Sequence, residues 1–305
     1  MKNSEINIRD PFVLVHDNKY YLYGTRSETC WGPADGFDCY VSDDLENWEG
    51  PFEIFHRPEG FFADAFYWAP ECYEYEGAFY LVATLGTLDN TIKKGTYILR
   101  SERPEGPFEV YSERITPADW TCIDATMYIE EGEPWIVFSH SFEDPGSVDG
   151  DYCLMKLSHD LRTASGHEDG SLALPEDIVT LFSAKDCPWA TPVPFAKAEF
   201  GIDGDCYFSD GPSLLMIDDS LYMINSSWGG RGYAVGVARS DSGRIAGPWS
   251  IQNEPLYPEN GGHGMFFKDL NGDIIFTLHY PNDKYLERPH FMKVTEKDGT
   301  LVLDK

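Results

Sequence analysis

The sequence has no long apolar stretch, and this absence excludes one large class of proteins. No apolar run in its 305 residues approaches the roughly 20 residues that a membrane-spanning helix needs. Residues 1–5 also lack the apolar core of a signal peptide. We therefore expect a cytoplasmic protein that has no membrane partner.

Basic residues are also scarce. Lysine and arginine total 23, against 52 aspartates and glutamates, and the formal net charge is -29. Such a chain repels phosphate backbones, and no local basic patch interrupts the acidity. We therefore expect no nucleic-acid partner, and we interpret the acidity itself as a solvated surface.

Paired cysteines and common catalytic motifs are missing as well. The seven cysteines are odd in number and widely scattered, and none forms the Cys-x-x-Cys pair typical of zinc sites. The sequence contains no Walker loop, no His-Glu-x-x-His and no Gly-x-Ser-x-Gly. Reduced thiols are expected, and nucleotide enzymes and zinc enzymes are disfavoured.

Aromatic residues, in contrast, are abundant. They make up 15% of the chain, which suits both strand packing and stacking against sugar rings. Short alternating or apolar runs bounded by Gly, Asp, Asn and Pro recur along the whole chain, whereas helical periodicity is hard to find. These patterns predict an all-β fold.

Five segments of the chain share one pattern. In each, a strand is followed by a turn rich in acidic residues, Asn or Gly, and then by a strand dense in aromatic and β-branched residues. The first strands begin near residues 10, 68, 124, 210 and 263. The pattern predicts a five-bladed β-propeller in which residues 1–305 form a single domain. The long interval between residues 124 and 210 is expected to contain loops that project from the wheel.

Polar residues stand at the starts of four of these first strands, namely Asp10, Asp124, Asp210 and His263. Because the innermost strands of a propeller line its channel, these side chains are expected to converge on one mouth. The spacing to the second strand supports the alignment, since Tyr21, Trp135 and Tyr222 follow the three aspartates by 11, 11 and 12 residues. Crowded carboxylates push their pKa values apart, as glycoside hydrolysis requires. An aspartate that only caps a turn is the alternative for each.

The order of five short motifs makes the interpretation more specific. They are Arg9-Asp10-Pro11, Tyr67-Trp68-Ala69-Pro70-Glu71, Ile123-Asp124, Asp210-Gly211-Pro212 and Gly262-His263-Gly264. Together they resemble glycoside hydrolase family 43, from about residue 8 to about residue 294. The resemblance implies an inverting hydrolase of furanosides or xylosides that requires no cofactor. It also implies that Asp10 is the general base and that Asp124 orients the acid and tunes its pKa.

Asp210 departs from the family pattern, which usually has glutamate before this Gly-Pro. The aspartate side chain is one methylene shorter, and a misplacement of about 1 Å can cost on the order of 100-fold in rate. We take Asp210 as the candidate acid. The alternatives are that Glu71 or a loop acid such as Glu199 donates the proton, or that hydrolytic activity has been lost.

Five further residues are candidates for substrate binding. Trp68, Trp31 and Trp228 offer indole faces for stacking on a sugar ring, and Glu71 lies close to Trp68 in the sequence. Arg288 follows a pattern similar to the family's late arginine and could clamp a carboxylate or a hydroxyl group. Burial between blades is the alternative for the tryptophans, and a surface ion pair is the alternative for Arg288.

His263 is the candidate metal residue. In similar enzymes the corresponding Gly-His contributes to a central site that often holds a water-coordinated calcium, so a structural calcium is one expectation. A hydrogen-bonded histidine without metal is the other, because calcium prefers oxygen ligands.

These features predict an exo-acting glycosidase whose partner is an oligosaccharide or glycoside. The leading substrate is an α-L-arabinofuranoside. A β-D-galactofuranoside has the same ring stereochemistry around the anomeric centre, and β-xylosides come next. A non-catalytic sugar-binding propeller and a phosphorylase are the alternatives from other classes.

Overall fold

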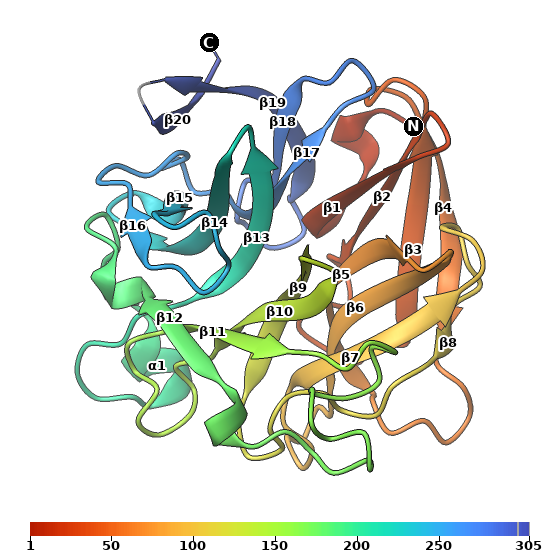
Figure 1. Cartoon of the computed structure of the whole chain (residues 1–305), viewed down its shortest axis with the longest axis horizontal. Coiled ribbons are helices and arrows are strands. Elements are labelled where there is room, and N and C mark those ends of the chain that lie inside the picture. Colours follow the sequence, from red (N-terminus) through yellow and green to blue (C-terminus); the bar gives the residue numbers. More distant parts are fainter. Residues whose placement is uncertain (298, 305) are drawn as a thin grey trace.

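The computed structural model describes residues 1–297 and 299–304. Five four-stranded antiparallel sheets are arranged around a common axis, so the predicted five-bladed β-propeller is confirmed (Figure 1). In these residues helix is limited to α1 (Ala196–Phe200) and three 3₁₀ turns, Asn3–Glu5, Pro175–Asp177 and Ala184–Asp186. None of the described helices is long and apolar enough to cross a membrane. The assignment of residues 1–305 to one domain stays a prediction.

Each blade uses consecutive strands, numbered from the axis outward. Blade 1 contains β1 (Ile8–His16), β2 (Lys19–Arg26), β3 (Gly36–Ser42) and β4 (Trp48–His56); blade 2 contains β5 (Ala65–Tyr75), β6 (Ala78–Gly86), β7 (Gly95–Ser101) and β8 (Glu109–Val110); blade 3 contains β9 (Cys122–Glu130), β10 (Glu133–His140), β11 (Asp151–Lys156) and β12 (Val179–Ser183); blade 4 contains β13 (Asp210–Ile217), β14 (Ser220–Gly229), β15 (Gly232–Ser240) and β16 (Trp249–Ile251); blade 5 contains β17 (Gly262–Lys268), β18 (Ile274–Tyr280), β19 (Arg288–Lys297) and β20 (Thr300–Leu303).

The tight turns between first and second strands follow from their residues. Asp17 and Asn18 have φ angles of 47° and 58°, and Glu131 and Gly132 have φ angles of 54° and 85°. Two successive residues with positive φ make the type I′ turn, whose twist matches that of an antiparallel hairpin. The acidic, Asn and Gly residues of the repeat therefore define the hairpins.

The hydrophobic core lies between the blades. Apolar clusters join blades 2 and 3, blades 3 and 4, and blades 4 and 5, and one cluster joins blade 1 to both blade 2 and blade 5. Phe37 and Leu81 are fully buried in this last cluster, and burial of one such side chain contributes roughly 1.5–3 kcal/mol. The ring of blades is thus closed by side-chain packing.

The innermost strands share a local irregularity near their starts. In each, a residue with positive φ lies where the pairing register with the second strand shifts. These residues are Asp10, Ala69, Asp124, Gly211 and His263, and β5 has a second residue of this kind, Phe66, with a φ of 57°. These bulges turn Asp10, Asp124 and His263 out of the regular alternation of the strand.

The bulges correct one predicted alignment. In blade 4 the positive φ of 45° belongs to Gly211, and Asp210 therefore stands one position before the residue that is equivalent to Asp10. Counted from Gly211, the spacing to Tyr222 is 11 residues, the same as in blades 1 and 3. The spacing of 12 counted from Asp210 was the sign of this shift.

Four of these residues donate a backbone hydrogen bond to the preceding blade. The amides of Ala69, Asp124, His263 and Asp10 donate to Thr25 Oγ1, Thr84 Oγ1, Ser226 Oγ and His279 Nδ1, at 2.8, 2.9, 3.0 and 3.2 Å. All four acceptors lie on second strands. The positions of these four residues therefore depend on the neighbouring blade.

Candidate active site

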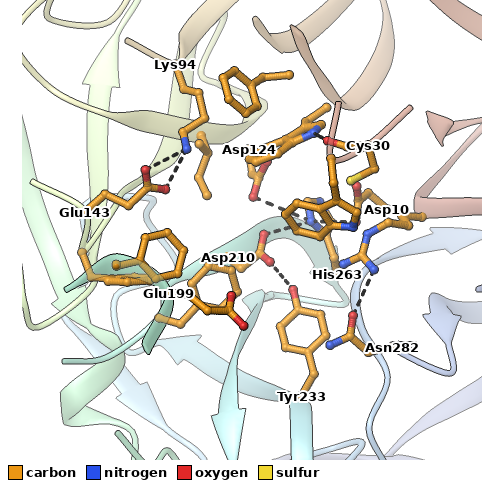
Figure 2. Close-up of a pocket in the computed structure, with 18 of the residues that line it drawn as sticks. Asp10, Cys30, Lys94, Asp124, Glu143, Glu199, Asp210, Tyr233, His263 and Asn282 are labelled. Atoms are coloured by element: carbon orange, nitrogen blue, oxygen red, sulfur yellow. Dashed lines mark hydrogen bonds and ion pairs between the residues drawn. The ribbon is translucent and has the colours of Figure 1, made fainter. Parts of the chain in front are cut away.

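A cavity of about 460 Å³ opens at one mouth of the central channel (Figure 2). Asp10, Asp124, Asp210 and His263 all line it, so the structure brings together the four polar residues that the sequence singled out. Residues from all five blades contribute to its walls. The connection between β12 and β13 adds four more, Phe195, Glu199, Phe200 and Phe208.

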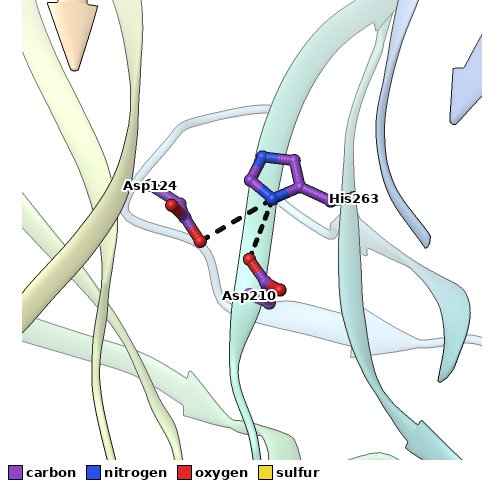
Figure 3. A group of neighbouring side chains, drawn as sticks. All are labelled: Asp124, Asp210 and His263. Atoms are coloured by element: carbon purple, nitrogen blue, oxygen red, sulfur yellow. Dashed lines mark ion pairs between the residues drawn. The ribbon is translucent and has the colours of Figure 1, made fainter. Parts of the chain in front are cut away.

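The imidazole of His263 lies among the three carboxylates. Its Nδ1 is 2.9 Å from Asp210 Oδ1 and 3.7 Å from Asp124 Oδ2 (Figure 3), and 3.4 Å from Asp10 Oδ1. Burial opposes the charged form, but the three carboxylates outweigh it and raise the pKa of His263 to about 10. An imidazolium therefore balances part of the negative charge of the site.

Asp10 is held in its ionised form. Burial alone would raise its pKa, but the charges of His263 and Arg9 lower the pKa below its ordinary value. Thr25 Oγ1 donates to Asp10 Oδ2 at 2.5 Å. His279 itself stays neutral, because burial and the nearby Arg9 lower its pKa.

Asp124 and Asp210 behave as a coupled pair. Burial and the charge of Asp210 raise the pKa of Asp124 well above its ordinary value. For Asp210, His263 and the Asp124 carboxyl outweigh burial and lower the pKa. These opposite shifts favour Asp124 over Asp210 as the member of the pair that carries a proton.

Two neighbours fix Asp210 and His263. The hydroxyl of Tyr233, on β15, donates a hydrogen bond to Asp210 Oδ2. A Cβ at Gly211 would lie 2.8 Å from the His263 ring. Glycine at this position lets the imidazole approach the strand that carries Asp210.

The three predicted tryptophans line the cavity. Trp31 and Trp68 meet edge to face at 5.5 Å, and Trp68 Nε1 donates to the Cys30 carbonyl at 2.8 Å. Trp31 is 53% exposed, so its ring is available to a ligand. Trp228 lies on blade 4, at the end of β14.

Glu71 and Arg288 are placed elsewhere. Neither is among the described residues that line the cavity. Glu71 accepts a hydrogen bond from the Tyr73 hydroxyl, and burial raises its pKa to about 7. Arg288 donates to the carbonyls of Ser4 and Glu287. The structure therefore does not bring these two residues together with the other predicted site residues, because Glu71 is held by Tyr73 and Arg288 is held by the N-terminal segment. Their predicted substrate contacts stay predictions.

Arg9 is a cavity residue that the sequence interpretation missed. Its Nη1 donates to Glu287 Oε1 at 2.7 Å and to Asn282 Oδ1 at 3.1 Å, and its guanidinium lies 5.3 Å from the Trp31 ring. Glu287 is fully buried. A fixed guanidinium beside Asp10 suits the recognition of sugar hydroxyls. The signal was present, since Arg9 directly precedes Asp10.

A second charged pair was also missed. Lys94 Nζ lies 2.7 and 2.9 Å from the carboxylate oxygens of Glu143, and both residues line the cavity. The ammonium group also lies 4.8 and 5.2 Å from the rings of Phe66 and Trp68. In Figure 2 this pair lies away from Asp10 and Asn282. Arg9 and the Lys94–Glu143 pair therefore place charged groups on two separate walls of the cavity.

Three known proteins are similar to this chain in sequence or in fold. The chain is 27% identical to the extracellular exo-α-(1→5)-L-arabinofuranosidase ArbA of Cellvibrio japonicus, over 93% of this chain and 82% of the relative. It is 33% identical to the endo-arabinase of Bacteroides thetaiotaomicron, with 98% of each chain covered and a TM-score of 0.84. An α-L-arabinofuranosidase of Lactobacillus brevis shares the fold, at 16% identity, with 99% of this chain and 97% of that chain covered and a TM-score of 0.70.

One prediction is overturned by these relatives. The expected cytoplasmic location is contradicted by ArbA, whose name describes an extracellular enzyme. The prediction failed because the absence of an apolar segment from residues 1–5 does not determine the compartment in which a folded chain works.

The family description covers nearly the whole chain. Residues 4–300 match Glycosyl hydrolases family 43. Enzymes of this family need no cofactor for catalysis, and their substrates are carbohydrates. The chain therefore belongs to glycosyl hydrolases family 43, whose enzymes cleave glycosidic bonds with inversion at the anomeric carbon.

Proposed function

We propose that this enzyme removes terminal α-L-arabinofuranosyl units, with Asp10 as general base and Asp210 as general acid. The observation that carries the proposal is the grouping of three carboxylates around one imidazolium, which separates their pKa values. Inverting hydrolysis needs one ionised and one protonated carboxyl group. Asp10 supplies the first, and the Asp124–Asp210 pair supplies the second.

The reaction is a single displacement. Asp10 accepts a proton from a water molecule while the water oxygen bonds to the anomeric carbon. The bond from that carbon to the leaving oxygen breaks, and the leaving oxygen receives the proton of the Asp124–Asp210 pair. The product sugar has the opposite anomeric configuration.

The distance between the Asp10 and Asp210 carboxylates affects how the leaving oxygen can receive its proton. Asp10 Oδ1 and Asp210 Oδ1 lie 3.4 and 2.9 Å from the same His263 nitrogen. Their oxygens are therefore closer than the roughly 6.5–9.5 Å that leaves room for water in inverting enzymes. We propose that Asp210 turns away from His263 when substrate enters. Loss of the imidazolium contact would raise its pKa and let it take the proton from Asp124.

The preference for a terminal sugar is supported by the cavity walls. Side chains from all five blades surround the cavity, which suits one chain end better than the middle of a polymer. The arabinose preference is supported by the names of ArbA and of the Bacteroides endo-arabinase. The extracellular relative also supports action on a substrate outside the cell.

Calcium is not part of this proposal. Asp124, Asp210 and His263 are the described residues that could hold a metal, with ligand atoms within 4.8 Å of one another. Calcium takes roughly six to eight oxygen ligands, and His263 Nδ1 already faces the carboxylates as an imidazolium. This set of donors does not fit calcium.

A panel of 4-nitrophenyl glycosides tests the substrate. We expect kcat/KM for the α-L-arabinofuranoside to exceed that for the β-D-galactofuranoside and the β-D-xyloside by at least about 10-fold, in the range that pocket contacts supply. Chelation with EDTA should leave the rate unchanged. A higher kcat/KM for either of the other two glycosides would show that the arabinofuranoside is not the preferred substrate. Ligand binding without any turnover would indicate a non-catalytic sugar-binding propeller.

Arg9 provides a second test of the pocket. Arg9→Lys should raise KM for the arabinofuranoside by roughly 10-fold, because an ammonium group cannot hold Glu287 and also present a planar fork to the sugar. Arg288→Lys is the matched control and should change KM less than twofold. Equal effects of the two substitutions would remove Arg9 from substrate binding.

A further inference from the structure

Six aromatic side chains form a closed circuit of contacts at the cavity, which we call the aromatic collar. All six line the cavity: Phe142, Phe195, Phe200, Phe208, Trp228 and Tyr233. Neighbouring ring centroids are 5.1 Å apart for Phe142–Phe200, 6.4 Å for Phe200–Phe195, 5.1 Å for Phe195–Trp228, 6.4 Å for Trp228–Tyr233, 6.0 Å for Tyr233–Phe208 and 5.8 Å for Phe208–Phe142. Every ring thus contacts the next.

The collar is built mostly from connections between strands. Phe142 follows β10, and three of the phenylalanines belong to the connection between β12 and β13 that contains α1. Phe142 is buried, whereas Phe200 is 43% exposed. A buried ring at one side and an exposed one at the other make a surface that can take up an apolar group from solvent.

The collar lies on the proton-donor side of the site. Tyr233 belongs to it, and the hydroxyl of Tyr233 donates to Asp210. Figure 2 shows Glu199 and Tyr233 grouped near Asp210, while Cys30 and Asp10 lie beyond His263, at the right of the view. In an inverting enzyme the acid protonates the leaving oxygen and the base activates water on the opposite face. The collar therefore borders the leaving group.

Hydrogen-bonding groups are few on this wall. Four of the six rings are phenylalanines, and the Tyr233 hydroxyl is already bonded to Asp210. Polar groups close to the collar in the sequence are the Trp228 indole N–H, the Glu199 carboxylate and the Glu143 carboxylate, which is paired with Lys94. The Arg9 and Lys94–Glu143 walls, in contrast, present charges that suit sugar hydroxyls.

We propose that the aromatic collar is a leaving-group subsite for apolar aglycones, meaning alcohols with an aryl or alkyl body. This inference rests on the proposed function, because it uses the assignment of Asp210 as acid. The enzyme then cleaves an arabinofuranosyl unit from a hydrophobic carrier more efficiently than from a hydroxyl-rich sugar chain.

The test compares three substrates with the same glycone. Methyl α-L-arabinofuranoside, 2-phenylethyl α-L-arabinofuranoside and α-(1→5)-arabinobiose all release a primary alcohol, so they differ mainly in what the leaving-group side binds. We expect kcat/KM for the phenylethyl glycoside to exceed that for the methyl glycoside by on the order of 100-fold, from burial of one aromatic ring. It should also exceed that for arabinobiose.

Phe200→Ala should lower the phenylethyl-to-methyl ratio of kcat/KM by about 10-fold, since one collar ring is lost. Phe52→Ala is the matched control, because Phe52 is also 43% exposed but lies on β4. This control should leave the ratio unchanged. If arabinobiose is the best of the three substrates and Phe200→Ala weakens it equally, the collar is a sugar subsite and the inference is wrong.

A binding measurement separates this inference from the proposed function. Titration calorimetry with 2-phenylethanol should give a millimolar Kd for the unmodified enzyme and a weaker one for Phe200→Ala. If no arabinofuranoside is hydrolysed but this binding is found, the proposed substrate fails and the apolar subsite stands. If arabinofuranosides are hydrolysed but 2-phenylethanol does not bind and the substrate ratio is near one, the apolar subsite is overturned.

Discussion

Asp10→Asn is expected to lower kcat/KM for 4-nitrophenyl α-L-arabinofuranoside by about 10³–10⁴-fold, toward the upper end of general-base effects. The amide keeps the size of the side chain and can still accept from Thr25 Oγ1, but it cannot take a proton from water. Steady-state kinetics measures the loss. The pH profile of the unmodified enzyme gives a second readout. Because the pKa of Asp10 is lowered, activity should persist as pH falls through the ordinary carboxyl range, to below about pH 4.

Two controls accompany this prediction. Thermal melting of the Asp10→Asn variant should stay within a few degrees of the unmodified protein, which excludes unfolding as the cause. Azide should restore turnover of the Asp10→Ala variant, because a small anion can replace the activated water, and NMR should then detect a glycosyl azide of inverted configuration. An unchanged kcat/KM for Asp10→Asn would remove Asp10 from the mechanism.

The loss of activity in the Asp210→Asn variant should depend on the leaving group of the substrate. With arabinobiose, whose leaving oxygen needs a proton, kcat should fall by about 10³-fold. With the 2,4-dinitrophenyl glycoside, whose leaving oxygen is stable as an anion, the loss should stay within about 10-fold. Comparing kcat for the two substrates isolates proton donation from other effects of the substitution.

Glu199→Gln is the matched comparison, because Glu199 lines the same cavity. Both substrates should be hydrolysed within about threefold of the unmodified rate if Asp210 is the acid. If kcat on arabinobiose alone falls strongly in the Glu199 variant and does not fall in the Asp210 variant, proton donation belongs to Glu199.

The alkaline limb of the pH profile of the unmodified enzyme should lie above the ordinary carboxyl range, since the pKa of Asp124 is raised.

Much of the fold was predictable because it depends on local patterns. The type I′ turns at Asp17-Asn18 and Glu131-Gly132 contain Asp, Asn or Gly, which tolerate positive φ, and the strands around them carry the expected aromatic residues. Repetition of this unit five times leaves a propeller as the arrangement that buries every sheet face. Convergence of Asp10, Asp124 and His263 then follows from symmetry.

What was missed depends on contacts between distant segments. Lys94 pairs with Glu143 across two blades, and nothing near either residue indicates the pair. Arg288 sits in a motif similar to the family's, but its direction is set by its bond to Ser4 at the other end of the chain. The offset of Asp210 was visible in its spacing, although only the bulge at Gly211 explains it.

The hydrogen bonds that cross between blades have a consequence for how this enzyme can be divided or rearranged. Thr84 of blade 2 holds the amide of Asp124 in blade 3, and Ser226 of blade 4 holds that of His263 in blade 5. A truncated chain that lacks blade 2 or blade 4 would therefore lose the anchor of Asp124 or of His263 in the next blade as well as its own residues. Circular permutants that keep all five blades, with new termini in the outer loops, would preserve every anchor.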